Sequence, residues 1–408
     1  MRKAISDGPE GDIARIGALD QRSQERLDIQ LEAAMAWLCV AQDRDADAGV
    51  AGSYTLLKGW TKSYPETTGY IIPTFLAYAR YSEREEFVER GIRMADWLLS
   101  VQSPDGSFGG GVVGGKAWAS VFDTGQILFG LLETHRATAS SVYLDAAISA
   151  GKWLVAAQDG DGSWPGRYDF MGRRHAYNAR VAWPLLLLGD VSGEGLFTAA
   201  AARHVSWVLE HTHPDGFVDR SAFDPDGTYG FRRSITTILR DRNVPSFYTT
   251  ASLHTLAYAL EGLLESARLL GHREAFDSAQ KGAAALAQHA RTGLLAGFYG
   301  PGWTPLSRSL CLTGAAQMAL VWMRLQEEGD QFVEAADRAI GVLLDSQRLR
   351  DRPDWLFGAV AGSKPLYGRY LPFRYPNWAV KFTADAYLAR LELASVRRRQ
   401  HLSRWSPT

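Results

Sequence analysis

The feature that most constrains the fold is a sequence frame that recurs along the chain. Trp37 to Gln42, Trp97 to Gln102 and Trp153 to Gln158 each place a tryptophan five residues before a glutamine, at the end of an amphipathic run. Weaker copies of the frame occupy residues 207–212, 286–291 and 342–347. Self-similarity at a spacing of roughly sixty residues indicates repeated units that bury their apolar faces against one another.

Gln102 and Gln158 are each followed by an Asp-Gly turn, at Asp105 and Asp161, and another at Asp215 follows the weaker copy at 207–212. Asp-Gly supplies the positive φ of a tight turn and so ends one helix of each pair. The spacing of Val88, Ile92, Ala95 and Leu99 predicts that this helix is one-sided and lies on the outside.

The partner segment of each pair is apolar on nearly all sides, which predicts a helix buried on both faces. Pro184 falls inside one of these segments and predicts a kink or a later helix start. The six inner segments are 69–80, 121–135, 176–188, 252–269, 310–325 and 378–391.

Six helical hairpins of this kind predict an all-α fold, an (α/α)6 barrel or toroid. Hydrophobic residues make up 46% of the chain and charged residues 22%, which is enough apolar surface for one large core. We expect residues 1–22 to be an N-terminal extension, residues 23–396 the toroid and residues 397–408 a basic tail. The longer interval between residues 212 and 291 predicts an extra loop near 215–247.

The charge balance and the number of cysteines limit the partners and the cellular compartment that can be expected. Lysine and arginine number 44 against 45 acidic residues, without a broad basic field, so nucleic acid is not an expected partner. The two cysteines do not suggest a disulfide framework, and no apolar run is long enough for a signal peptide or a membrane span. These features predict a cytoplasmic protein, as a monomer or a homodimer.

The turns after Gln102 and Gln158 resemble the QW repeats of terpenoid cyclases and prenyltransferases, which are α/α toroids. The barrel is also similar to those of six-hairpin glycosidases, certain polysaccharide lyases and N-acylglucosamine 2-epimerases. A closer resemblance is to VpsJ-like proteins of bacterial exopolysaccharide clusters, through the stretches 63–70, 311–317 and 375–382. This resemblance implies a toroid and a role in polysaccharide biosynthesis or processing, without assigning the reaction.

Parallel inner helices would gather their N-termini at one mouth of the ring, so side chains far apart in sequence become neighbours. Pooled at the end of an apolar barrel, polar and aromatic groups form the kind of pocket that binds a small ligand. The predicted substrate-binding residues are Tyr64, Tyr70, Gln126, His175, Asn178, Arg180, Tyr248, Trp303, Arg308, Arg374, Tyr375, Asn377 and Lys381.

Glu66 and Asp123 are the carboxylates best placed to act as an acid and base pair, because glycosidic cleavage needs one protonated and one ionised carboxyl group. The competing interpretation is helix N-capping. His254 and Tyr177 provide a second chemistry, proton transfer beside a sugar carbonyl or a uronate. Their competing interpretation is a structural role in the core.

The leading hypothesis is therefore a carbohydrate-active enzyme that works by hydrolysis, elimination or epimerisation on an oligosaccharide or sugar intermediate. Two alternatives stay open, an isoprenoid cyclase or prenyltransferase and a non-catalytic glycan-binding toroid. The sequence has no Walker loop, HExxH, paired CxxC or GxSxG motif, and we expect no cofactor and no metal.

Overall fold

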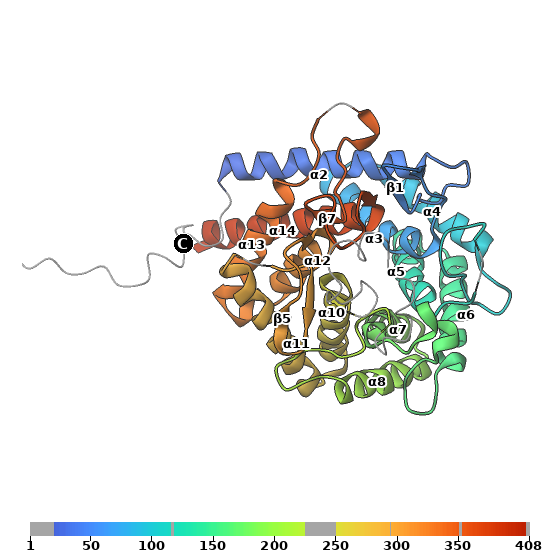
Figure 1. Cartoon of the computed structure of the whole chain (residues 1–408). Helices are drawn as coiled ribbons and strands as arrows, with labels where there is room; N and C mark the ends of the chain where they lie inside the picture. Colours follow the sequence, from blue (N-terminus) through green and yellow to red (C-terminus); the bar gives the residue numbers. More distant parts are fainter. Residues whose placement is uncertain (1–19, 116–117, 225–249, 294, 351–352, 405–408) are drawn as a thin grey trace, which may run out of the picture.

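The computed structural model describes residues 20–115, 118–224, 250–293, 295–350 and 353–404, with side chains up to residue 395. Twelve long helices within these segments form two concentric rings (Figure 1). The inner ring consists of α3 (Pro65–Ser82), α5 (Val121–Thr138), α7 (Ala179–Ser192), α10 (Leu253–Leu270), α12 (Leu312–Arg324) and α14 (Asn377–Arg404). The outer ring consists of α2 (Gln21–Gln42), α4 (Glu86–Val101), α6 (Ser141–Ala157), α8 (Gly195–Glu210), α11 (Arg273–Arg291) and α13 (Asp330–Leu344).

The inner ring is closed. Each inner helix packs against the next one along the chain, and α14 packs against α3 to complete the circle. Each of α3, α5, α7, α10 and α12 also packs on the outer helix that follows it, while α14 packs on α2. The predicted (α/α)6 toroid is therefore confirmed.

Short strands lie where the inner helices begin. One sheet contains β1 (Ser53–Thr55), β2 (Gly59–Trp60) and β8 (Arg374–Pro376). A second sheet contains β3 (Ala251–Ser252), β4 (Phe298–Gly300) and β5 (Thr304–Pro305), and β6 (Leu310–Cys311) pairs with β7 (Ser363–Lys364). These strands connect the loops that lead into different inner helices.

The repeated glutamine has a structural function. Gln102 donates from Nε2 to the carbonyl of Gly106 in its own turn and to that of Ala146 in α6, both at 3.0 Å. Gln158 makes the equivalent pair with Gly162 and Ala200 at 2.9 Å. One side chain thus ties each turn to the next outer helix, and this explains why the frame recurs.

Neighbouring inner helices approach closely at glycines. A Cβ on Gly69 of α3 would lie 2.6 Å from the Cα of Ile127, and a Cβ on Gly130 of α5 would lie 2.3 Å from the carbonyl of Gly69. Pro73 lacks the N–H that would bond this carbonyl within α3. Glycine therefore permits the α3–α5 contact where proline has freed a backbone oxygen.

Pro184 lies inside α7, which is preceded by a 3-10 turn at Ala176–Asn178. A proline at this position leaves the carbonyl of Arg180 without its helical donor. Gln126 Nε2 of α5 donates to that carbonyl at 3.4 Å. The apparent conflict between Pro184 and the helix is therefore resolved by a side chain of the neighbouring inner helix.

Other predicted boundaries differ in detail. The buried face of α4 contains Phe87, Gly91, Met94 and Leu98. Three of the residues predicted for this face, Val88, Ile92 and Leu99, are only half-buried and lie at its edge. The helix α14 continues through residues 397–404, which were expected to form a tail. Among the helices of the described segments, none combines the length and apolarity needed to cross a bilayer.

Candidate functional site

The chain segments that lead into the inner helices lie together at one end of the toroid. β1, before α3, pairs with β8, before α14, and β6, before α12, pairs with β7. The N–H of Val113, in the loop before α5, donates to the carbonyl of Ser63 at 2.9 Å. This end is referred to below as the N-terminal mouth.

Two carboxylates from adjacent inner helices meet at the N-terminal mouth. Glu66 lies in the first turn of α3 and Asp123 in the first turn of α5, and their exposed fractions are 7% and 5%. Tyr64, which directly precedes α3, lies close enough to both carboxyl groups to lower the pKa of each. The structure therefore brings together three residues that the sequence placed at this mouth.

The two carboxyl groups are electrostatically different. Burial raises the pKa of Glu66 well above its usual range, and the nearby charge of Asp123 raises it further. Burial also raises the pKa of Asp123, to about 6, although hydrogen bonds from Ser120 and Gly111 oppose the shift. Asp123 is therefore mostly ionised near neutral pH, and Glu66 holds its proton more readily than Asp123 does.

Neither carboxylate is an N-cap residue. Tyr64 and Ser120 occupy the N-cap positions of α3 and α5. Asp123 accepts from the Ser120 hydroxyl at 2.5 Å and from the Gly111 N–H at 3.2 Å, so it also supports its loop. Within the described residues no helix amide donates to Glu66, and the nearby phenol of Tyr64 lowers its pKa.

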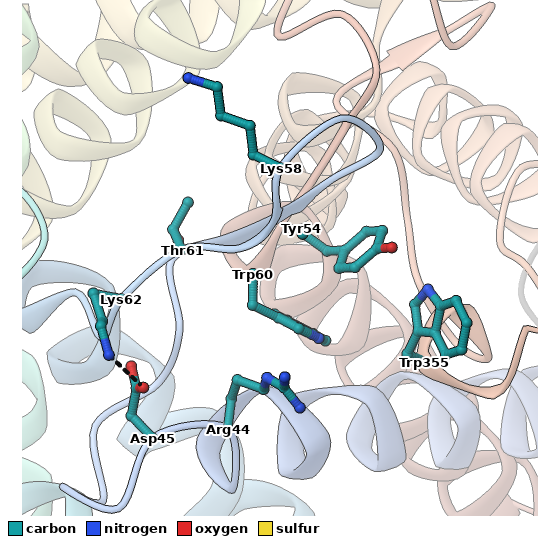
Figure 2. A pocket seen from close by; sticks show the side chains of 9 residues that line it. Arg44, Asp45, Tyr54, Lys58, Trp60, Thr61, Lys62 and Trp355 are labelled. Atoms are coloured by element: carbon teal, nitrogen blue, oxygen red, sulfur yellow. Dashed lines mark hydrogen bonds and ion pairs between the residues drawn. The ribbon is translucent and has the colours of Figure 1, made fainter.

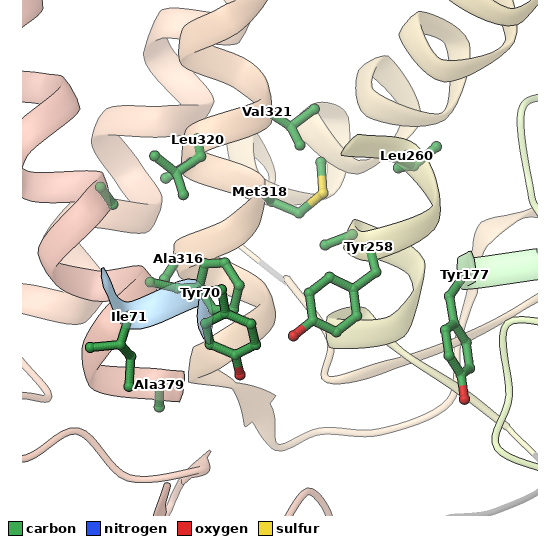
Figure 3. Close-up of a cluster of buried hydrophobic side chains, with 14 of the residues drawn as sticks. Tyr70, Ile71, Tyr177, Tyr258, Leu260, Ala316, Met318, Leu320, Val321 and Ala379 are labelled. Atoms are coloured by element: carbon green, nitrogen blue, oxygen red, sulfur yellow. The ribbon is translucent and has the colours of Figure 1, made fainter. Parts of the chain in front are cut away.

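Aromatic rings surround the carboxylates. Phe122 contacts Tyr177 and Tyr258 with ring centroids 5.3 Å and 5.0 Å apart, and the hydroxyl of Tyr258 has no hydrogen-bond partner within the described residues. Figure 3 shows Tyr70 and Tyr258 converging from different inner helices, with Tyr177 on a separate segment. Burial raises the pKa of Tyr70, Tyr177 and Tyr258, and the charge of Glu66 adds to each shift.

Tyr258 was missed by the sequence reasoning. It lies one helical turn after His254, and that i, i+4 spacing was the signal available. The ring of His254 lies 4.4 Å from Tyr258, and its Nδ1 lies 2.7 Å from Oε1 of Gln317. Burial lowers the pKa of His254 to about 4, so the imidazole is neutral at pH 7.

His175 has a different environment. Its Nε2 lies 2.7 Å from the carbonyl of Phe170, and its ring stacks on Tyr177 at 4.5 Å. Burial lowers the pKa of His175 to about 4. These contacts orient the loop and the ring of Tyr177 rather than presenting His175 to the mouth.

A third buried carboxylate, Asp169, was also missed. Its exposed fraction is 4%, its Oδ2 accepts from Asn178 at 2.8 Å, and its Oδ1 has no partner within the described residues. Burial raises its pKa well above the usual range, and the charge of Asp123 contributes. Its position in a loop before an inner helix is the same signal that singled out Glu66.

Arg180 and Lys381 extend from the mouth toward the middle of the barrel. Arg180 pairs with Glu261 and donates from Nε to Gln126 at 3.0 Å. Lys381 lies 2.6 Å from Asp385, and burial lowers its pKa to about 8. Both cations line a cavity of about 360 Å³ that continues along the inner helices to Arg324 and Glu392.

Tyr70 also lines this cavity. Of the predicted cations in the described residues, Arg180 alone lies close enough to lower the pKa of Glu66. Lys381 instead belongs to a charged network with Asp385, away from the predicted mouth contacts.

The remaining predicted residues lie elsewhere. Trp303 donates to the carbonyl of Asp215 at 3.1 Å and packs on Phe217, so it holds a turn against the outer ring. Asn377 is buried and donates to the Ala51 carbonyl and to Thr67. Tyr375 is buried in the sheet opposite Tyr54, Arg374 is partly buried, Arg308 is exposed, and Tyr248 lies outside the described residues.

No group of three or more His, Cys, Asp and Glu side chains in the described segments is arranged to hold a metal ion. Glu66, Asp123 and Asp169 are therefore not arranged as a metal site.

The fold is shared with carbohydrate-active enzymes. No family model matches the chain, and no curated protein matches it. An unsaturated glucuronyl hydrolase specific for heparin aligns over 92% of this chain and 98% of its own, with a TM-score of 0.66 and 15% identity. Cellobiose 2-epimerase from Bacillus thermoamylovorans aligns over 90% and 98%, with a TM-score of 0.66 and 12% identity.

A family 88 glycosyl hydrolase from Bacteroides vulgatus aligns over 90% of this chain and 99% of its own, with a TM-score of 0.60 and 10% identity. At these identities the comparisons show a six-hairpin glycosidase-like toroid that hydrolases and epimerases both use. The predicted relation to VpsJ-like proteins is not tested by them.

Proposed function

We propose that the protein is a carbohydrate-active enzyme of polysaccharide biosynthesis or processing, which cleaves a glycosidic bond at the N-terminal mouth. The observation that carries this proposal is the pair Glu66 and Asp123. They are buried together beside Tyr64, and burial raises the pKa of both, with the charge of Asp123 raising that of Glu66 further, so Glu66 holds its proton more readily. Two carboxyl groups in opposite protonation states are what glycoside hydrolysis requires.

In this mechanism Glu66 donates its proton to the glycosidic oxygen as the bond to the anomeric carbon breaks. Asp123 accepts a proton from the water that attacks the anomeric carbon, so one water is consumed for each bond cleaved. Tyr64, between the two carboxyl groups, is placed to hold the reacting oxygen or the water. After product release, one proton moves from Asp123 to solvent and one returns to Glu66.

Several neighbouring groups suit a sugar ligand. Phe122 and Tyr177 present ring faces on which the apolar side of a sugar can stack. The unpaired Oδ1 of Asp169 can accept a sugar hydroxyl. Carbohydrate enzymes among the solved structures of this fold further support a sugar substrate.

The test is the charge-neutral substitution Glu66→Gln. We expect turnover of an oligosaccharide substrate to fall about 10²- to 10⁴-fold, because the general acid is lost, while substrate affinity stays within a factor of about three. Glu89→Gln, at an exposed position of α4, is the matched control. Release of reducing ends measures turnover and calorimetry measures binding, and unchanged turnover in Glu66→Gln would end the hydrolytic proposal.

Epimerisation is the second candidate, because His254 is a neutral imidazole whose Nδ1 is held by Gln317 beside Tyr258. Such a ring can accept a proton from carbon at neutral pH. Incubation in deuterated water separates the two reactions. Epimerisation places deuterium on a sugar carbon without changing the chain length, whereas hydrolysis shortens the chain. Binding without either change would indicate a glycan-binding toroid.

A further inference from the structure

A second pocket lies on the rim of the toroid, outside the carboxylate site. Its volume is about 500 Å³, within the range of small-molecule sites. It is formed by the β1–β2 hairpin, the residues that follow α2 and the short 3-10 helix Asp354–Leu356 (Figure 2). None of the residues of the carboxylate site lines it. We call it the rim pocket.

Three aromatic rings from two distant parts of the chain line the rim pocket. Tyr54 lies edge-on to Trp60, with centroids 5.4 Å apart and planes at 71°, and faces Trp355 at 6.5 Å and 44°. Trp60 is fixed from behind by Trp37 at 5.1 Å, whereas Trp355 has an exposed fraction of 44%. A partly exposed tryptophan beside a preformed aromatic wall is available for a ligand.

The charged groups of the rim pocket are mostly basic. The lining contains three cationic residues, Arg44, Lys58 and Lys62. Its single carboxylate is that of Asp45, which lies 3.0 Å from Lys62. Within the described part of the chain, the side chains of Arg44 and Lys58 have no hydrogen bond or ion pair. Figure 2 shows Arg44 directed toward the indole of Trp60. The lining therefore has an excess of two positive charges that its own residues do not neutralise.

We propose that the rim pocket binds an acidic oligosaccharide, with sugar rings stacked on Trp355 and Trp60 and a uronate carboxylate on Arg44 or Lys58. The indole rings offer apolar faces on which sugar rings can stack. Guanidinium and ammonium groups select the carboxylate. This binding function does not depend on catalysis at Glu66 and Asp123.

The experiment compares two probes on the full chain by isothermal titration calorimetry, a hyaluronan tetrasaccharide, which carries carboxylates, and neutral cellotetraose. Trp355→Ala tests the stacking surface, and Leu269→Ala, at a residue with 51% exposure in α10, is the matched control. Thermal unfolding of each variant checks its folding.

We expect the hyaluronan tetrasaccharide to bind more tightly than cellotetraose and to lose affinity with added salt. We expect Trp355→Ala to weaken this binding about tenfold or more, while Leu269→Ala leaves it unchanged. Equal binding to wild type and Trp355→Ala would overturn the proposal, as would the absence of binding to wild type. Equal affinity for inorganic phosphate would also overturn it, by showing a general anion site.

Discussion

Substituting Asp123 by Asn should make the protein more stable, and increasingly so as the pH rises. The pKa of Asp123 is about 6 in the folded protein, against 3.8 for a free aspartate, so the folded state holds the proton more tightly. The stability of the wild type therefore falls between pH 3.8 and pH 6 as this group ionises. That difference corresponds to on the order of 3 kcal/mol at about 1.4 kcal/mol per pH unit.

An asparagine is neutral at every pH and does not incur this loss. Its oxygen can still accept from Gly111, but the bond from Ser120 is weakened, which lowers the stability of the variant by about 1 kcal/mol at all pH values. The net gain should therefore approach about 2 kcal/mol above pH 7 and disappear near pH 4.

Urea unfolding at several pH values between 4 and 8 measures the difference between Asp123→Asn and wild type. Asp145→Asn, at an exposed position of α6, is the control and should show a flat difference. The same Asp123→Asn protein should lose about 10²- to 10⁴-fold of turnover, because the base is gone. A stability difference that does not change with pH would refute the assignment of a strained, ionised carboxylate at this position.

Two structural contacts give further predictions. Gln102→Ala removes two hydrogen bonds that join a turn to α6. It should lower the free energy of unfolding, measured in urea, by about 1–3 kcal/mol. A change below about 0.3 kcal/mol would show that the repeated glutamine does not stabilise the contact between the turn and the helix. Arg180→Met leaves Glu261 buried with Arg324 as its remaining partner and should destabilise the protein by about 3–5 kcal/mol, with recovery in Arg180→Met/Glu261→Leu. No recovery in the double variant would attribute the loss to packing.

The fold could be predicted because its determinants are local and repeated. The Trp-to-Gln frame marks the end of outer helices, and segments that are apolar on all sides can only lie between two layers. Helix ends were less predictable, since Pro184 is accommodated by Gln126 from another helix. Which face of α4 is buried depends on the helices against which α4 packs, and sequence spacing alone does not contain that information.

The site was predicted only in part, for a related reason. All inner helices run in the same direction, so residues near their starts lie at the same mouth. This rule correctly grouped Glu66, Asp123, Tyr64 and Tyr177. The same rule does not say which way a side chain turns, and Lys381 points along the barrel to Asp385. Trp303 and Asn377 were expected at a ligand, but the structure gives them backbone partners whose positions the sequence does not reveal.

The difference between the two mouth carboxylates arises from what each accepts. Both lie in the first turn of a helix, where the positive end of the helix dipole should lower the pKa of each. Burial overrides the dipole at both positions, but Asp123 also receives a hydroxyl and an amide hydrogen bond, which keep its pKa near 6. Glu66 lies beside the phenol of Tyr64 and faces the charge of Asp123, so it holds its proton more readily than Asp123 does. The loop that carries Gly111 and the N-cap Ser120 thus gives the two similar carboxyl groups different pKa values, and the proposed hydrolysis depends on this difference.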